Sequence, residues 1–226
     1  MAEFLLESQN VSRMLSSDIP VTLVKDASVQ IKAGEFVVIT GPSGSGKSSL
    51  LYLLGLLDTP SQGRLVLQGQ DISTLPENDV AQIRLEKLGF VFQFHFLLPE
   101  FSALENVMLP MQRLGRLPER QIKAQAEEIL VKLGMGEQIH KLPKQMSGGQ
   151  CQRVAVARAL ANDPILILAD EPTGNLDTVS SKRVQDMFQE IAHAQNRAVV
   201  AVTHDTEFAK LADRQIHIVD GRIVAS

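Results

Sequence analysis

A glycine-rich segment between two apolar runs constrains the fold of this chain more than any other feature. The segment, Gly41–Ser48, fits the pattern G-x-x-x-x-G-K-[ST]. The residues before it, Phe36–Thr40, form a short apolar run of the kind found in strands buried on both faces. The residues after it, Ser48–Leu57, are apolar nearly all round, which is typical of a buried helix. A strand, a glycine-rich loop and a helix in this order predict an α/β fold.

The residue types of this loop suit the binding of phosphate groups. Glycines allow successive backbone N–H groups to turn toward phosphate oxygens, and the N-terminus of the following helix adds the positive end of its dipole. We expect Lys47 to reach the β- and γ-phosphates of a nucleotide and the Ser48 hydroxyl to bind Mg²⁺. The predicted nucleotide-binding residues of the loop are Gly41, Pro42, Ser43, Gly44, Ser45, Gly46, Lys47, Ser48 and Ser49.

Strands and helices alternate along the rest of the chain. Short apolar or β-branched runs predict strands at 22–31, 36–40, 64–67, 165–169, 198–202, 216–219 and 222–224. Helical spacing and capping patterns predict helices at 48–57, 74–87, 118–133, 154–161 and 184–191. A capping box of Thr74 and Glu77 is expected to start the second helix, and Asp220-Gly221 to turn the final hairpin. This alternation indicates an α/β core with a helical insertion at about 93–163.

Two acidic residues follow the apolar run at 165–169. The carboxyl end of a parallel strand is where an open α/β sheet binds its ligands. Asp170 there suits Mg²⁺ through its water shell, and Glu171, which points differently, suits the polarisation of an attacking water as general base. Paired acids also begin turns, so the functional interpretation depends on the phosphate loop in the same chain.

A second anion-binding pattern precedes the small-residue helix at 154–161. Ser147 and Gln150 have the spacing of a capping box, and Gly148 and Gly149 between them allow close approach to exposed backbone N–H groups. The chain therefore contains two helix N-termini that suit anions.

These motifs, together with Gln93, Asn175-Leu176-Asp177 and His204, resemble the ATP-binding subunits of ABC transporters over nearly the whole chain. The resemblance implies one domain, 1–226, with bound ATP and Mg²⁺ and with ATP hydrolysis. Its parts are a P-loop NTPase (RecA-like) core with an antiparallel β subdomain, at 1–92 and 164–226, and a helical insertion subdomain, at 93–163. It also implies a head-to-tail dimer of two copies, in which the Ser147–Gln150 signature of one closes on the γ-phosphate held by the other's Lys47.

The resemblance also implies roles for single residues. Gln93 corresponds to the residue that senses Mg²⁺ and the attacking water, and Asp177 to one that communicates across the dimer. His204 corresponds to the switch histidine that contacts the γ-phosphate and orients Glu171. One position departs from the family, because the residues near Leu15 include no aromatic side chain to stack on adenine. Base selectivity is therefore left open.

The segment after Gln93 is rich in apolar residues. Five of them fall within eight positions: Phe94, Phe96, Leu97, Leu98 and Phe101. By the resemblance, integral membrane transporter subunits dock near Phe94–Val107, and we expect some of these side chains, Leu97 among them, to be exposed. The segment is most similar to the ATPases of lipoprotein-releasing transporters. ATPases of macrolide or peptide efflux complexes, and of complexes that regulate cell-wall hydrolases during division, remain alternatives.

Charge and composition exclude other classes of partner. The chain has 22 basic and 26 acidic residues, a net charge of −4, and thus no basic excess for nucleic acid. Its longest apolar stretch, Leu50–Leu57, is far short of the roughly 20 residues that span a bilayer. Glu3 stands where a signal peptide would be basic, and the single cysteine, Cys151, favours a reducing compartment. We expect a peripheral protein on the cytoplasmic face of a bacterial inner membrane, attached only through its partner.

Other uses of these motifs fit less well. A DNA-repair or chromosome-structural ATPase would place hundreds of coiled-coil residues between Lys47 and Asp170, where this chain has 122. A small-molecule kinase has no use for the Ser147–Gln150 motif. A subunit without hydrolytic activity would be expected to lack Glu171 or His204. The only tyrosine, Tyr52, is expected in the core, and Cys151 is interpreted as a neutral substitution.

Overall fold

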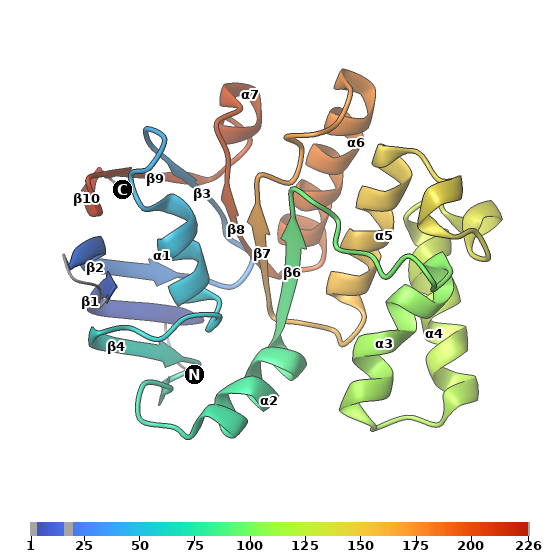
Figure 1. Ribbon diagram of the computed structural model, residues 1–226, viewed down its shortest axis with the longest axis horizontal. Helices are drawn as coiled ribbons and strands as arrows, with labels where there is room; N and C mark the ends of the chain where they lie inside the picture. Colours follow the sequence, from blue (N-terminus) through green and yellow to red (C-terminus); the bar gives the residue numbers. More distant parts are fainter. Residues whose placement is uncertain (1–3, 16–19, 226) are drawn as a thin grey trace.

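A computed structural model describes residues 4–15 and 20–225 of the chain (Figure 1). Its larger sheet has the strand order β10-β9-β3-β8-β7-β6, and every pairing except β10 with β9 is parallel. The strands are β3 (Phe36–Thr40), β6 (Leu88–Phe92), β7 (Leu166–Asp170), β8 (Ala198–Val202), β9 (Arg214–Val219) and β10 (Arg222–Ala225). The parallel core that the apolar runs predict is therefore confirmed.

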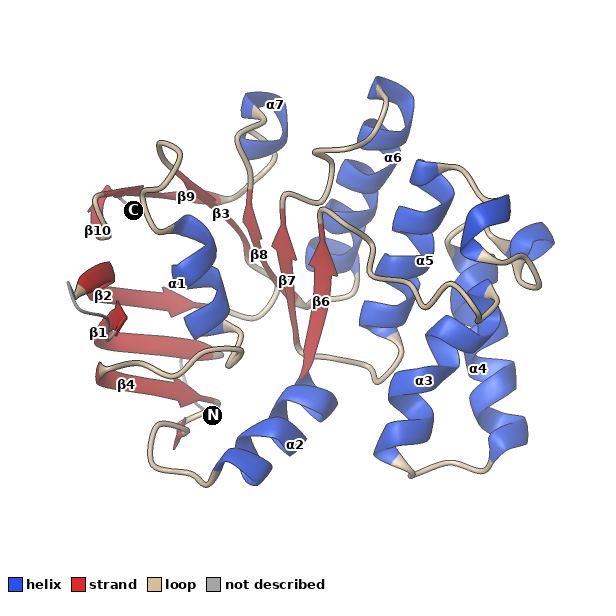
Figure 2. Ribbon diagram, in the orientation of Figure 1, coloured by secondary structure: helices blue, strands red, loops and turns tan. Residues whose placement is uncertain are grey.

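A smaller antiparallel sheet packs beside this core. Its order is β2-β1-β4-β5, with the strands β1 (Leu6–Leu15), β2 (Val21–Ile31), β4 (Gln62–Leu67) and β5 (Gln70–Asp71). Helix α1 (Lys47–Leu54) lies between the two sheets (Figure 2). Its leucines are buried in a core that both sheets share, which explains why the helix is apolar nearly all round.

The remaining helices are α2 (Glu77–Lys87), α3 (Ala103–Leu114), α4 (Glu119–Lys132), α5 (Gly148–Leu160), α6 (Thr178–Gln189) and α7 (Thr206–Ala209). Short 3₁₀ turns lie at Gly136–Gln138 and Pro143–Gln145, and a π-helical turn at Glu190–Ala194 extends α6. Helices α3, α4 and α5 enclose a second core, the helical insertion that the sequence predicts. Helix α5 packs into this core with Val154 and Ala157 and against the sheet with Val156. It therefore joins the insertion to the sheet.

Several details differ from the sequence-based prediction. Helix α2 begins at Glu77 with Pro76 at its N-cap and no side-chain cap, so the capping box at Thr74 is wrong. Helix α1 ends at Leu54, earlier than expected. Strand β6 follows α2 without an intervening turn, and α3 begins at an unpredicted capping box of Ser102 and Glu105.

Two residues that bear on the sequence-based predictions lie outside the described part of the chain. They are Glu3, used in the signal-peptide argument, and Ser16, one of the non-aromatic residues near Leu15. Among the described residues, no helix combines the length and the apolarity needed to cross a membrane.

Candidate active site

The phosphate loop, Gln93, Asp170, Glu171 and His204 gather where four neighbouring parallel strands end. The phosphate loop follows β3, and Gln93 follows β6. Asp170 and Glu171 lie at the end of β7, and His204 lies two residues beyond β8. Because these strands are parallel, their carboxyl ends meet at one edge of the sheet (Figure 2). Residues far apart in the sequence are thus brought to one edge.

The backbone of the phosphate loop leaves no room for side chains at two of its glycines. A Cβ atom at Gly41 would lie 2.1 Å from the carbonyl oxygen of Ile218, and one at Gly46 would lie 2.2 Å from that of Leu23. Both glycines also have positive φ angles, 147° and 98°. The loop is therefore shaped by its contacts with the sheets on either side.

The polar groups of the loop fit a bound polyphosphate. The Lys47 ammonium group donates to the carbonyl oxygens of Gly41 at 3.0 Å and Pro42 at 2.7 Å, and so lies folded over the loop. Within the described structure, the buried Ser45 hydroxyl has no hydrogen-bond partner. A lysine ammonium group over a glycine-rich loop at a helix N-terminus, together with an unpartnered hydroxyl, is a donor set that phosphate oxygens satisfy.

Both carboxylate oxygens of Asp170 are held by side chains of α1. The Ser48 hydroxyl donates to Oδ1 at 3.0 Å, and the Tyr52 hydroxyl donates to Oδ2 at 2.8 Å. Burial, and then the hydrogen bond to Asp170, raise the pKa of Tyr52 to about 12. The hydroxyl of Ser48 and the carboxylate of Asp170 are hard oxygen ligands of the kind that Mg²⁺ prefers, so the residues present fit this metal.

Tyr52 is the site residue that the sequence analysis missed. Its ring packs against the apolar core, as expected, but its hydroxyl reaches the site. The signal was its spacing from Ser48: residues four apart lie on one face of a helix, so both hydroxyls point to the same strand end.

Glu171 is fixed by its backbone and by His204. Its φ of 48° is unusual for a residue with a side chain, and its N–H donates to the carbonyl oxygen of Val202 at 2.9 Å. One carboxylate oxygen, Oε2, lies 2.9 Å from the His204 Nδ1 and accepts from the His204 backbone N–H at 3.3 Å. The Glu171 side chain is 18% exposed and that of His204 is 73% exposed. The acid is therefore shielded, while the imidazole stays open to a ligand.

Gln93 is held by the segment that follows Glu171. Its side-chain amide donates to the Asn175 side-chain oxygen at 3.2 Å, and the Asn175 amide donates back to the Gln93 carbonyl at 3.3 Å. A Cβ atom at Gly174 would lie 3.0 Å from Nε2 of Gln93. The ends of β6 and β7 are thus linked through these side chains.

The predicted capping box at the start of α5 is confirmed. The Ser147 hydroxyl accepts from the Gln150 N–H at 3.3 Å, and the Gln150 side chain accepts from the Ser147 N–H at 2.9 Å. Ser147 and Gly148 are exposed, whereas Gly149 is buried against Ser180. Helix α5 packs on β6, which lies three strands away from β3. Within one chain, the Ser147–Gln150 motif and the phosphate loop therefore lie apart from each other.

Asp177 caps the neighbouring helix α6. Its carboxylate accepts from the Ser180 hydroxyl at 2.7 Å and from the Ser180 N–H at 3.0 Å. These hydrogen bonds lower the pKa of Asp177 below its usual value. The carboxylate therefore stays ionised beside the α5 N-terminus.

The surface near Leu15 is aliphatic. In the β1–β2 register Leu15 lies opposite Val21, and both are exposed together with Met14. The described residues of this edge thus offer apolar contact without an aromatic ring.

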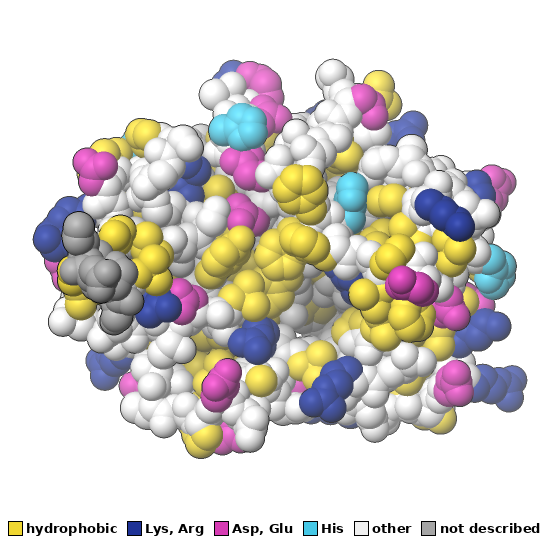
Figure 3. All heavy atoms as spheres, viewed as in Figure 1, with side chains coloured by type: hydrophobic (Ala, Val, Ile, Leu, Met, Phe, Trp, Pro, Cys, Tyr) yellow, Lys and Arg dark blue, Asp and Glu magenta, His cyan; other side chains and the backbone are white. Residues whose placement is uncertain are grey.

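A row of phenylalanines crosses the surface beside Gln93. Ring centroids are 6.0 Å apart between Phe90 and Phe92, 5.5 Å between Phe92 and Phe96, and 6.5 Å between Phe96 and Phe94. Phe94 is 65% exposed and Phe96 is 64% exposed. Figure 3 shows hydrophobic side chains gathered in the middle of this face. We call Phe90, Phe92, Phe94 and Phe96 the phenylalanine row.

Two neighbours of the phenylalanine row were not predicted correctly from the sequence. Leu97 is half-buried against the core of the helical insertion, so its expected exposure is wrong. Arg158 of α5 donates to the carbonyl oxygens of His95 at 2.8 Å and Phe96 at 2.7 Å. The row is thereby attached to the helix that begins with the signature motif.

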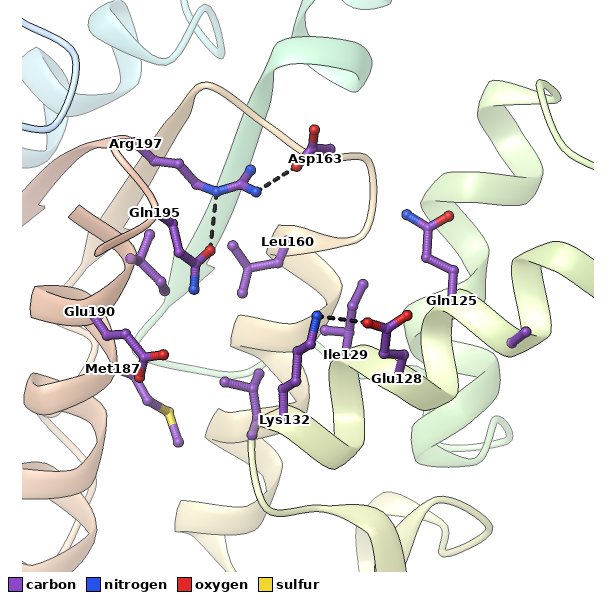
Figure 4. Close-up of a pocket in the computed structure, with 13 residues that line it drawn as sticks. Gln125, Glu128, Ile129, Lys132, Leu160, Asp163, Met187, Glu190, Gln195 and Arg197 are labelled. Carbon is purple, nitrogen blue, oxygen red and sulfur yellow. Dashed lines mark hydrogen bonds and ion pairs between the residues drawn. The ribbon is translucent and has the colours of Figure 1, made fainter. Parts of the chain in front are cut away.

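A groove of about 860 Å³ lies between α4 and the π-helical end of α6, and none of the predicted site residues lines it (Figure 4). Its basic side chains are already paired, Lys132 with Glu128 at 2.7 Å and Arg197 with Asp163 at 2.5 Å. The groove follows the boundary between the insertion and the core, and among its described lining residues no unpaired cation is left to bind phosphate.

Comparisons with known proteins identify the family of this chain. The family model for ABC transporters matches residues 24–174. The lipoprotein-releasing system ATP-binding protein LolD of Aquifex aeolicus is 46% identical over 224 residues, covering 99% of this chain and 97% of that protein. LolD of Shewanella sp. strain MR-7 is 44% identical over 226 residues, and an uncharacterized ABC transporter ATP-binding protein of Thermotoga maritima is 46% identical over 206. The chain therefore belongs to the ABC transporter family, as an ATP-binding subunit that hydrolyses ATP.

Solved structures support the same assignment of fold. The ATP-binding cassette MJ0796, in a dimeric post-hydrolysis state with ADP and Pi, matches with a TM-score of 0.90 and 37% identity over 97% of both chains. The predicted P-loop NTPase fold, with an antiparallel β subdomain and a helical subdomain, is thereby confirmed.

Proposed function

We propose that this chain is the ATPase of a lipoprotein-releasing transporter, bound peripherally to the cytoplasmic face of a bacterial inner membrane. The observation that carries the proposal is the similarity to LolD proteins of several bacteria along almost the entire length of both chains. The phenylalanine row supplies the matching structural feature, an exposed apolar surface beside the site that a membrane partner can cover.

In this proposal, the loop Gly41–Ser49 holds the phosphates of ATP, and Lys47 contacts the β- and γ-phosphates. Ser48 and Asp170 would hold Mg²⁺, with Gln93 completing the set from the end of β6. When bound, the metal neutralises charge on the phosphate oxygens. The hydrogen bond from Ser48 to Asp170 at 3.0 Å supports this set, since it places the two ligands side by side.

Glu171 is the proposed general base. Its shielded carboxylate can accept a proton from an attacking water, and the His204 imidazole, 2.9 Å away, keeps that carboxylate in one orientation. His204 is exposed on its other side and there can contact the γ-phosphate. Water, base and phosphate would thus be aligned by groups at the ends of β7 and β8.

A second copy completes the site. The motif Ser147, Gly148, Gly149 and Gln150 forms the N-terminus of α5, where Ser147 and Gly148 are exposed and can approach an anion, and Asp177 lies beside it. The dimeric MJ0796 structures support a dimer as the working unit. We propose a head-to-tail homodimer, in which each signature motif faces the γ-phosphate held by the other subunit.

Mixed dimers test this arrangement. One subunit carries Lys47→Ala and the other Gly148→Asp, so a head-to-tail pair contains one site with both lesions and one with neither. Gly148 is preferred to Gly149 because a Cβ atom there meets only Leu176, at 3.8 Å. The mixture should regain ATP hydrolysis that both mutant homodimers lack. If light scattering shows dimers but the mixture does not hydrolyse ATP, head-to-tail pairing is contradicted.

Reconstitution tests the transport function. The chain is purified with the membrane subunits encoded beside its gene, placed in proteoliposomes, and supplied with a triacylated lipoprotein. ATP should drive release of the lipoprotein into solution, and a complex with Glu171→Gln should not. Efflux of a macrolide without lipoprotein release would support the exporter alternative, and loss of cell-wall hydrolase control in cells lacking the chain would support the division alternative.

A further inference from the structure

Asp170 is anchored more completely than the phosphate-loop motif requires. Of the two hydroxyls that hold it, only the one from Ser48 belongs to that motif. The second comes from Tyr52, one helical turn further along α1, and binds the other carboxylate oxygen at 2.8 Å. With one donor on each oxygen, the carboxylate plane cannot rotate about its last bond without losing a hydrogen bond.

The Tyr52 hydroxyl is held firmly in this position. Its aromatic ring packs against the core that both sheets share, and its backbone carbonyl accepts from the N–H groups of Leu57 and Asp58. A tyrosine side chain has two rotatable bonds, so little freedom remains once the ring is packed. The hydroxyl position thus follows from the packing of α1.

The hydrogen-bond donor to Asp170 is an uncharged phenol hydroxyl. A phenol is neutral and protonated at physiological pH, so it can orient a carboxylate without cancelling its charge. A lysine or arginine in the same place would form an ion pair and compete with a divalent cation for Asp170. Tyr52 therefore orients the ligand and leaves its negative charge available.

We propose that Tyr52 is a positioning residue for Mg²⁺·ATP, holding Asp170 so that Oδ1 stays beside the Ser48 hydroxyl. This inference rests on the proposed role of Ser48 and Asp170 in binding Mg²⁺. Tyr52 touches neither the nucleotide nor the metal in this scheme, and it acts only through Asp170.

The composition of the chain supplies a direct probe. Tyr52 is the only tyrosine and there is no tryptophan, so intrinsic tyrosine fluorescence reports on this one hydroxyl and its surroundings. Adding Mg²⁺ with ATP should change the emission more than adding ATP in EDTA, since only the metal engages Asp170. Asp170→Asn should change the emission without any nucleotide.

The decisive variant is Tyr52→Phe, which keeps the packed ring and removes only the hydroxyl. Calorimetry should give an ATP affinity in EDTA within about twofold of wild type, because the phosphate loop is untouched. The apparent affinity for Mg²⁺ in the presence of ATP should fall about fivefold to tenfold, in line with the net contribution of one hydrogen bond. Saturating Mg²⁺ should restore most of kcat.

Two further variants make the result decisive. Ser8→Ala removes a buried hydroxyl that donates to the Ala27 carbonyl in the smaller sheet, and should leave Mg²⁺ dependence unchanged. Ser48→Ala tests the underlying Mg²⁺ site. If Ser48→Ala weakens Mg²⁺ binding and Tyr52→Phe does not, the role of Tyr52 is refuted. If Tyr52→Phe and Ser8→Ala weaken it equally, the effect is general destabilisation and the inference fails. If Ser48→Ala has no effect, the proposed Mg²⁺ site itself is wrong.

Discussion

Gly149 offers a test of whether a signature glycine is needed for packing as well as for ligand approach. Its position in α5 faces the first turn of α6, where a Cβ atom would lie 2.4 Å from Oγ and 2.7 Å from Cβ of Ser180. Both distances are shorter than any comfortable contact, so Gly149→Ala must push the two helix ends apart. Gly148, one residue earlier, has no neighbour nearer than 3.8 Å and provides the matched control.

The size of the effect follows from two opposing contributions. Forcing a methyl group into a packed contact costs about 1–3 kcal/mol, while replacing glycine by alanine in a helix gains up to about 1 kcal/mol. We expect Gly149→Ala to lower the free energy of unfolding by about 1–2 kcal/mol, a decrease in Tm of roughly 2–8 °C for a domain of this size. Gly148→Ala should be neutral or slightly stabilising.

A double-mutant cycle identifies the cause. Ser180→Gly removes both clashing atoms, and the Ser180 Cα then remains at 3.9 Å, an ordinary contact. In that background Gly149→Ala should cost less than about 0.5 kcal/mol, giving a coupling energy of about 1–2 kcal/mol in urea unfolding. An equal cost of Gly149→Ala in both backgrounds would refute the packing explanation and leave ligand approach as the reason for glycine.

Three other predictions concern separate parts of the molecule. Glu171→Gln should leave ATP binding intact by calorimetry and lower turnover by about 10²-fold or more, since it removes the general base; wild-type turnover would exclude that role. Phe94→Asp should change the free energy of unfolding by no more than a surface substitution does, about 0.5 kcal/mol. It should nevertheless abolish co-purification with the membrane subunits, because a charge would be buried unpaired; intact assembly would move the docking site elsewhere. Hydrogen bonds from Ser102 lower the pKa of Glu105 below 4.5, so the stability that this carboxylate adds is present above pH 4.5 and is lost as pH falls through the lowered value. Glu105→Ala should therefore lower the free energy of urea unfolding at pH 7 by about 0.3–1 kcal/mol, as for other exposed acids in a first helical turn. The loss should shrink as the pH falls through the lowered pKa of Glu105, and a loss independent of pH would contradict the assignment.

Local sequence patterns predicted the parts of this fold that local physics decides. The apolar runs of β3, β7 and β8 are buried on both faces of the sheet, and Asp220 and Gly221 both take the positive φ angles that the final hairpin needs. The capping box of Ser147 and Gln150 also formed as its spacing predicts. For the hairpin turn and the capping box, the deciding contacts lie within a few residues.

The misses have a common origin in tertiary contacts. Strand β6 follows α2 directly, with no glycine or proline between them, and only its pairing with β7 makes it a strand. Leu97 resembles its exposed neighbours in sequence but packs on the helical insertion. The hydroxyl of Tyr52 donates to Asp170, which lies 118 residues away in the chain. The roles of Gln93 and His204 came from the family resemblance and not from their local sequence.

Strand β3 carries consequences for how the chain is made. Both of its sheet neighbours, β8 and β9, come from beyond residue 197, whereas the antiparallel sheet is complete by Asp71. During synthesis from the N-terminus, the antiparallel sheet can therefore form early. The apolar strand β3 stays unpaired until β8 and β9 have been synthesised. The final hairpin also fixes the phosphate loop, since the Gly221 N–H donates to the Ser45 carbonyl at 2.9 Å. A polypeptide ending just after His204 would contain every motif residue and still lack both β9 and this support of the phosphate loop.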